Sequence, residues 1–205
     1  MAALKIKVCG MRDLENIIQL KELAPDYLGF IFYAKSPRYV ETIDKSLLNL
    51  LQPIKKTAVF VNATLDEVTT MVKEHRFEAV QLHGNESPDY CSEMKKKGVE
   101  VIKAFGIHED FNWELLEPYL DVIDYFLFDT YTSAHGGSGK TFNWEALKNY
   151  PFDKPYFLSG GIGPDNIESA LAVQDERLYG LDLNSKFEDS PGLKNIELLK
   201  TVLKK

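Results

Sequence analysis

The sequence predicts an α/β protein that folds as a single-domain (β/α)₈ TIM barrel. Eight short runs of apolar, β-branched or aromatic residues alternate along the chain with eight amphipathic segments. Residues 58–61 and 125–128 are apolar throughout, which is typical of parallel strands covered on both faces. An open, doubly wound sheet is the alternative, but a spacing of roughly 20 to 30 residues per unit favours the closed barrel.

Each predicted unit consists of a strand followed by a helix. The predicted strands span residues 4–9, 27–33, 57–62, 79–83, 101–105, 123–129, 156–159 and 178–183. Apolar residues recur at helical spacing after each strand, and the predicted helices span residues 13–23, 44–51, 65–75, 88–97, 110–120, 143–149, 165–173 and 193–203.

Two helix starts carry clear capping signals. Thr64 followed by Glu67 forms a capping box, and Ser87 followed by Pro88 is an N-cap with proline at the first helical position. Because no composition break or Gly/Ser linker interrupts the chain, residues 1–205 are predicted to form a single (β/α)₈ barrel domain.

Composition excludes several classes of protein. The chain has 205 residues, 44% of them hydrophobic, and a formal net charge of −7 without a basic stripe, which argues against a nucleic-acid partner. No apolar run approaches the roughly 20 residues of a membrane helix, and the N-terminus does not resemble a signal peptide. Cys9 and Cys91 are too few for a disulfide framework and fit no zinc spacing. We therefore expect a cytoplasmic protein with no membrane partner.

Two polar residues stand at the carboxyl ends of predicted strands, where a barrel of this kind has its active site. Cys9 ends the first strand, and the nearby Lys7 and Arg12 would stabilise its thiolate. Asp129 ends the sixth strand after four apolar or aromatic residues, at a place where it could act as an acid. Structural alternatives stay open for both, since Cys is often a small buried residue and Asp often caps a turn.

A glycine-rich segment follows the seventh predicted strand. Residues 160–165 read GGIGPD, and such a turn before a helix exposes backbone N–H groups that suit a phosphate. The loops after the seventh and eighth strands of a barrel are the usual phosphate site. An ordinary turn is the alternative.

A second glycine-rich segment, residues 134–141 (AHGGSGKT), fits a relaxed Walker A pattern. We reject a P-loop, because four residues separate the segment from the strand that ends at Asp129 and the helix behind it stops at Pro151. We interpret it as a lid over the barrel. His75, His108 and His135 show no metal-ligand spacing, so no metal site is predicted.

Motifs spread over nearly the whole chain resemble, in order, those of the phosphoribosylanthranilate isomerase family of tryptophan biosynthesis. They are KVCG at 7–10, GFIF at 29–32 followed by SPRY at 36–39, VFVN at 59–62, VQLHG at 80–84, FDT at 128–130, GGSGKTFNW at 136–144 and LSGG at 158–161. Each motif is weak alone, but their co-occurrence in this order is highly specific.

The resemblance implies a barrel without cofactor or metal that carries out an Amadori rearrangement of the small-molecule substrate N-(5′-phosphoribosyl)anthranilate. It implies that Asp129 is the general acid that protonates the furanose ring oxygen, and that Cys9 is the general base that takes the C2′ proton. Arg38 would contact the anthranilate carboxylate, for which a guanidinium fork is well suited, and His83 would line the same mouth.

The resemblance also implies that backbone amides at Gly160, Gly161, Asn184 and Ser185 hold the phosphate. One stretch departs from the family, because residues 184–188 read NSKFE where the family usually has SSGVE, and Asn195 replaces the usual Asp. The lost glycine leaves the conformation of this loop open. Whether Lys186 contacts the phosphate or points to solvent is open as well.

Other functions are compatible with parts of this pattern. An indole-glycerol-phosphate synthase would need a catalytic Lys and Glu where this chain has Cys9 and His83, and another sugar-phosphate isomerase is a further alternative. A non-catalytic protein that binds a phosphate ligand would keep the glycine loops without needing Cys9 and Asp129 together. No apolar helix face forces association, so we expect a monomer and leave a homodimer open. Because the expected substrate is an anion and the chain is acidic, attraction must be local.

Overall fold

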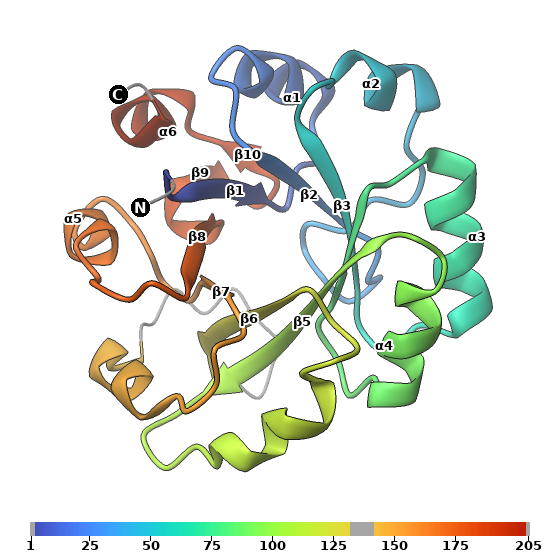
Figure 1. Ribbon diagram of the computed structural model, residues 1–205. Coiled ribbons are helices and arrows are strands. Elements are labelled where there is room, and N and C mark those ends of the chain that lie inside the picture. Colours follow the sequence, from blue (N-terminus) through green and yellow to red (C-terminus); the bar gives the residue numbers. More distant parts are fainter. Residues whose placement is uncertain (1–2, 132–141, 204–205) are drawn as a thin grey trace.

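The computed structural model describes residues 3–131 and 142–203. Eight parallel strands close into a barrel in sequence order, and β8 pairs back with β1. Figure 1 shows the strands in a central ring with the helices arranged around it. The predicted barrel is confirmed, and the open sheet is excluded.

All eight predicted strands form, with bounds that differ by a few residues. They are β1 (Lys5–Cys9), β2 (Tyr27–Ile31), β3 (Lys55–Phe60), β4 (Ala79–Leu82), β5 (Glu100–Ile107), β6 (Tyr125–Thr130), β7 (Tyr156–Leu158) and β8 (Leu178–Leu183). The α-helices are α1 (Leu14–Lys21), α2 (Lys45–Leu50), α3 (Leu65–His75), α4 (Pro88–Lys95), α5 (Ile167–Leu171) and α6 (Ile196–Leu203).

The predicted capping signals are confirmed. The Thr64 hydroxyl accepts from the Glu67 N–H at 3.3 Å, while the Glu67 carboxylate accepts from the Thr64 N–H at 2.8 Å. The Ser87 hydroxyl accepts from the N–H of Tyr90, and Pro88 begins α4. The local sequence therefore determines where α3 and α4 begin.

The helical segments after β5 and β6 differ from the prediction. Both are short 3₁₀ helices, η1 (Trp113–Tyr119) and η2 (Trp144–Asn149), rather than α-helices. Pro118 lies inside η1, and a proline in this position lacks the N–H that an α-helix would use. The predicted helix 143–149 is only two turns long, a length at which 3₁₀ geometry is common.

The end of the chain also differs from the prediction. A 3₁₀ turn, η3 (Ser185–Phe187), is followed by an antiparallel hairpin of β9 (Glu188–Ser190) and β10 (Leu193–Lys194). The predicted helix 193–203 is therefore wrong in its first three residues, and α6 begins at Ile196. Gly192, with a φ of +87°, makes the turn of this hairpin.

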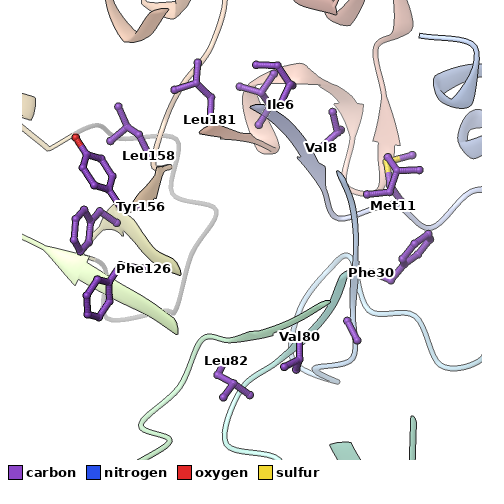
Figure 2. Packing of buried hydrophobic residues seen from close by; sticks show 14 of the residues in the cluster. Ile6, Val8, Met11, Phe30, Val80, Leu82, Phe126, Tyr156, Leu158 and Leu181 are labelled. Carbon is purple, nitrogen blue, oxygen red and sulfur yellow. The ribbon is translucent and has the colours of Figure 1, made fainter. Parts of the chain in front are cut away.

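Alternation along the strands divides the barrel into an outer and an inner set of side chains. The outward residues pack beneath the helices, as Ile6 and Val8 of β1 and Val80 and Leu82 of β4 do in Figure 2. A separate inner cluster fills the barrel and contains Tyr27, Ala79, Ile102, Ala104, Leu127 and Phe157. Polar residues of the inner set lie at both ends of this cluster. Lys55 and Glu100 pair at the amino ends of β3 and β5, and Cys9 and Asp129 lie at the carboxyl ends of β1 and β6.

Among the described residues, no helix has the length and hydrophobicity required to cross a membrane.

Candidate active site

The residues expected in the site lie at one end of the barrel. Cys9 is the last residue of β1, His83 directly follows β4, and Asp129 is the penultimate residue of β6. The expected phosphate residues follow the two neighbouring strands β7 and β8. They are Gly160, Gly161, Asn184 and Ser185.

The Cys9 thiol is buried against β2. Cys9 pairs in register with Gly29, and a β-carbon added to Gly29 would lie 2.6 Å from the Cys9 sulfur. Glycine at this position therefore leaves the space that the thiol occupies. Only 3% of Cys9 is exposed.

Lys7 favours the Cys9 thiolate as expected, but burial has the larger effect on the pKa of Cys9. Burial raises this pKa above its usual 9.0, and the nearby charges of Lys7 and Lys194 offset only part of that rise. Lys194 also takes the place expected for Arg12, whose guanidinium donates to the carbonyl of Pro37 at 3.1 Å. Burial therefore outweighs the neighbouring cations and favours the thiol over the thiolate.

Lys7 lies deeper in the barrel than Cys9, on the same face of β1. Its ammonium donates to Oδ1 of Asp182 on β8 at 2.8 Å, and the hydroxyl of Ser159 donates to Oδ2 of Asp182 at 3.5 Å. Lys7 is fully buried and Asp182 is 5% exposed. The barrel thus contains a buried ion pair directly beneath the thiol.

The Asp129 carboxylate is positioned by groups on two sides. Oδ1 accepts from the N–H of Thr130 at 2.8 Å, and Oδ2 lies 3.5 Å from Nε2 of His83. The other ring nitrogen of His83 is 2.8 Å from Nε2 of Gln81. Strands β4 and β6 therefore bring the carboxyl group of Asp129 next to the imidazole and the amide of His83 and Gln81, which lie more than 40 residues earlier in the sequence.

Arg38 is anchored by a residue that sequence reasoning did not identify as part of the site. Its Nε and Nη2 donate to the Glu188 carboxylate at 2.7–3.0 Å, and Glu188 also accepts from Nζ of Lys194 at 2.7 Å. Lys194 donates to Oδ1 of Asn184 at 2.8 Å as well. An added β-carbon on Gly10 would lie 2.6 Å from Cδ of Arg38, so Gly10 gives the arginine room to cross the barrel mouth.

Glu188 and Lys194 belong to the β9–β10 hairpin, which the sequence prediction missed. The Pro191-Gly192 pair between them is a turn signal that would have pointed to the hairpin. Burial would raise the pKa of Glu188, but the Arg38 hydrogen bonds and the Lys194 charge hold it below its usual 4.5. Burial lowers the pKa of Lys194, although Glu188 works against this change. Glu188 and Lys194 form an ion pair, since Nζ of Lys194 lies 2.7 Å from Oε1 of Glu188.

The loop after β7 adopts a conformation that depends on glycine. Gly160 and Gly161 have φ values of +88° and +64°, and a β-carbon on Gly160 would lie 2.3 Å from the Thr130 hydroxyl. Asn166 holds the loop, accepting from the N–H of Gly163 at 2.8 Å and donating to the Gly161 carbonyl at 3.1 Å.

The backbone around this loop has unused donors. Within the described residues, the N–H groups of Gly160, Gly161, Asn184 and Ser185 donate to no backbone carbonyl. Unpaired N–H groups at the ends of adjacent strands suit an anion such as a phosphate. The stem of Lys186 packs beside this loop, because a β-carbon on Gly163 would lie 2.7 Å from Cβ of Lys186.

The Walker A-like segment 134–141, which we interpret from the sequence as a lid and which contains His135, lies outside the described residues.

Across residues 3–131 and 142–203, no group of three or more His, Cys, Asp or Glu side chains is placed to hold a metal ion.

The mouth of this (β/α)₈ barrel holds a thiol and a carboxyl group beside a glycine loop with free amides. This combination is typical of acid–base enzymes that act on phosphorylated substrates. The model of the N-(5′-phosphoribosyl)anthranilate (PRA) isomerase family matches residues 6–205. The chain belongs to this family. It is an aldose–ketose isomerase of tryptophan biosynthesis.

Individual relatives agree with this assignment. The N-(5′-phosphoribosyl)anthranilate isomerase of Parabacteroides distasonis is 43% identical over 201 residues, which cover 97% of this chain and 91% of the relative. The crystal structure of the Thermotoga maritima enzyme is 32% identical, covers 98% of both chains and has a TM-score of 0.84. Another structure, 28% identical with a TM-score of 0.78 and covering 98% and 97% of the two chains, holds reduced 1-(o-carboxyphenylamino)-1-deoxyribulose 5-phosphate.

Proposed function

We propose that Asp129 is the general acid and Cys9 the general base of the isomerisation. The observation that carries the proposal is that the two groups stand at the carboxyl ends of β6 and β1, and that each lies beside a nitrogen-bearing side chain. His83 faces the Asp129 carboxylate at 3.5 Å, and Lys7 lies beneath Cys9. No other thiol belongs to the inner set of side chains in the described part of the barrel, since Cys91 lies on α4.

The reaction needs one proton donor and one proton acceptor. Asp129 gives its proton to the furanose ring oxygen, the bond from C1′ to that oxygen breaks, and the anthranilate nitrogen supplies the electron pair of the resulting Schiff base. The Cys9 thiolate then takes the C2′ proton, and the electrons of that C–H bond form the enolamine, which tautomerises to the ketone. The charge of Lys7 lowers the pKa of Cys9 against the effect of burial and so favours the thiolate that this step needs.

The substrate carries one anionic group at each end, and we propose a site for each. Glu188 occupies Nε and Nη2 of Arg38, so the remaining Nη1 edge would meet the anthranilate carboxylate. The free amides of Gly160, Gly161, Asn184 and Ser185 would hold the phosphate. A carboxyl group and a phosphate are both present in the ligand bound by the related structure, which supports two anion sites in this mouth.

Fluorescence-monitored turnover of freshly prepared N-(5′-phosphoribosyl)anthranilate tests these roles. We expect Cys9→Ser and Asp129→Asn to lose roughly 10²- to 10⁴-fold in kcat, the usual contribution of a general acid or base. Cys91→Ser is the matched control, because Cys91 is also buried but lies on α4 outside the barrel mouth. Near-normal turnover in either Cys9→Ser or Asp129→Asn would show that the role has been assigned to the wrong residue.

Arg38→Lys tests the carboxylate site separately from the chemistry. Lysine keeps the positive charge but cannot reproduce the fork that grips Glu188, so we expect KM to rise about tenfold or more with a smaller change in kcat. An unchanged KM would place the anthranilate carboxylate elsewhere.

We further propose a cytoplasmic monomer. Both cysteines are free, as expected in a reducing compartment. The large exposed apolar side chains of the described residues are spread over α1, α2, η1, β10 and Tyr131 after β6. A related Thermotoga maritima enzyme, 30% identical, is described as dimeric, so light scattering at several protein concentrations is the deciding measurement. A mass of two chains at every concentration would show that the protein is a homodimer and not a monomer.

A further inference from the structure

Gln81 is a buried amide in the barrel wall that neither the fold nor the proposed chemistry explains. It is 1% exposed, and it precedes His83 by two residues, so the two side chains leave β4 on the same inner face. Its Nε2 atom lies 2.8 Å from Nδ1 of His83. Burial of a glutamine costs free energy unless hydrogen bonds compensate for the lost water, so this position would be expected to hold an apolar side chain if it served packing alone.

The direction of this hydrogen bond determines the state of the imidazole. The amide nitrogen can only donate, so Nδ1 of His83 must be the acceptor. A neutral imidazole that accepts at Nδ1 carries its proton on Nε2. Nε2 is the atom that faces Oδ2 of Asp129, at 3.5 Å.

We propose that Gln81 is a positioning residue that fixes His83 as the Nε2–H tautomer and thereby directs a proton donor at the Asp129 carboxylate. The proposal rests on the proposed role of Asp129 as the general acid. When Asp129 has given its proton to the substrate, its carboxylate faces two donors, the N–H of Thr130 at Oδ1 and the Nε2–H of His83 at Oδ2. The donor is in place before the charge develops, so no reorganisation is needed at that moment.

A rotated amide does not fit these surroundings. With Oε1 against Nδ1, His83 would carry its proton on Nδ1 and turn the lone pair of Nε2 toward Asp129, where it would repel the carboxylate formed once Asp129 has given up its proton. Among the described residues the amide has no partner besides Nδ1 of His83, so the observed orientation leaves Oε1 and one N–H unpaired, whereas rotation would leave both N–H groups without an acceptor.

Nitrogen NMR of the histidine side chains tests the proposal without reference to activity. In the wild-type protein we expect the His83 signals of a neutral ring protonated at Nε2, assigned by their loss in His83→Gln. In Gln81→Glu the side chain keeps its size but accepts instead of donating, so a proton should appear on Nδ1. Gln81→Met, which neither donates nor accepts, should leave a mixture of tautomers.

Turnover of the same variants gives a second readout. We expect Gln81→Met to lose about 10- to 100-fold in kcat with KM nearly unchanged, because only the placement of the acid is disturbed. Gln81→Glu should lose at least as much. A wild-type ring protonated at Nδ1, or a Gln81→Met protein that keeps the wild-type tautomer and kcat, would overturn the proposal. If instead the tautomer behaves as expected but Asp129→Asn keeps full activity, the assignment of the acid fails and the positioning of His83 stands.

Discussion

The Nζ atom of Lys7 lies 2.8 Å from Oδ1 of Asp182, and both side chains are buried inside the barrel beneath Cys9. Burial works against the charge on Lys7, but the pKa of Lys7 still lies above its usual 10.5, and the charge of Asp182 is the largest influence that raises it. Lys7 is therefore a permanent cation two residues from the thiol. It is the largest influence that favours the thiolate of Cys9.

Lys7→Met should impair both stability and activity. Removal of one partner leaves the Asp182 carboxylate buried without its cation, which costs roughly 3–5 kcal/mol in free energy of unfolding. Each unit by which the pKa of Cys9 rises lowers the thiolate population tenfold, so we expect kcat/KM at neutral pH to fall about tenfold or more.

The double variant Lys7→Met/Asp182→Leu separates these two effects. It should regain stability in urea denaturation, because no unpaired charge is left in the barrel, yet remain slow. If Lys7→Met alone turned over at the wild-type rate, Lys7 would have no part in ionising Cys9.

Gly29→Ala should displace the thiol. The new β-carbon would lie 2.6 Å from the Cys9 sulfur, closer than any real contact, and a displacement of about 1 Å can cost on the order of 10²-fold in rate. Steady-state kinetics should show a lower kcat in a protein that still folds. Gly98→Asn is the control, since the space around Gly98 is open and Asn tolerates its φ of +77°.

Stability should fall as the pH rises above 9. The folded protein holds the Cys9 proton more tightly than the unfolded chain, whose thiol ionises near 9.0, so the unfolded state releases a proton first. Stability is therefore fully present below pH 9.0 and declines above it, by about 1.4 kcal/mol per pH unit for each such group.

Cys9→Ser should reduce this slope in denaturation curves recorded between pH 8 and 10. Cys91→Ser should reduce it too, because burial raises the pKa of Cys91 to about 12, but it should leave turnover intact. Equal slopes in the wild type and both variants would refute the pKa direction of the thiols.

Glu188→Gln should weaken the hairpin at neutral pH more than at acid pH. The pKa of Glu188 is held below 4.5, so its contribution to stability is present above pH 4.5 and is lost as the pH falls through the folded value. We expect a loss of roughly 3 kcal/mol at neutral pH, where Arg38 and Lys194 lose their anion. Denaturation curves of the two proteins should converge in acid; a constant gap between them would contradict the depressed pKa.

Lys186→Met should raise KM modestly and in a salt-dependent way. The stem of Lys186 packs against the loop that carries the free amides, and its side chain is exposed, so we expect about 0.5–1 kcal/mol, a two- to fivefold increase in KM. Methionine keeps the apolar stem. The difference should shrink as salt is added, whereas no difference at low salt would mean that Lys186 does not meet the phosphate.

Local patterns in the sequence are enough to predict the order of the eight strands, the starts of α3 and α4, and the positions of Cys9, Asp129 and the glycine loop along the chain. Apolar runs, caps and glycine-rich turns act over a few residues, so they can be read without knowing the fold. The motifs also point to the family, because they occur in a fixed order over most of the chain.

Which side chains meet depends on the closed barrel. Glu188, which pairs with both Arg38 and Lys194, comes from a hairpin near the other end of the chain from Arg38. Asp182 reaches Lys7 only because β8 pairs with β1. The net pKa of Cys9 depends on the closed barrel as well. Neighbours in sequence indicate the charges around it, whereas burial, which exceeds their effect, exists only once the barrel has closed.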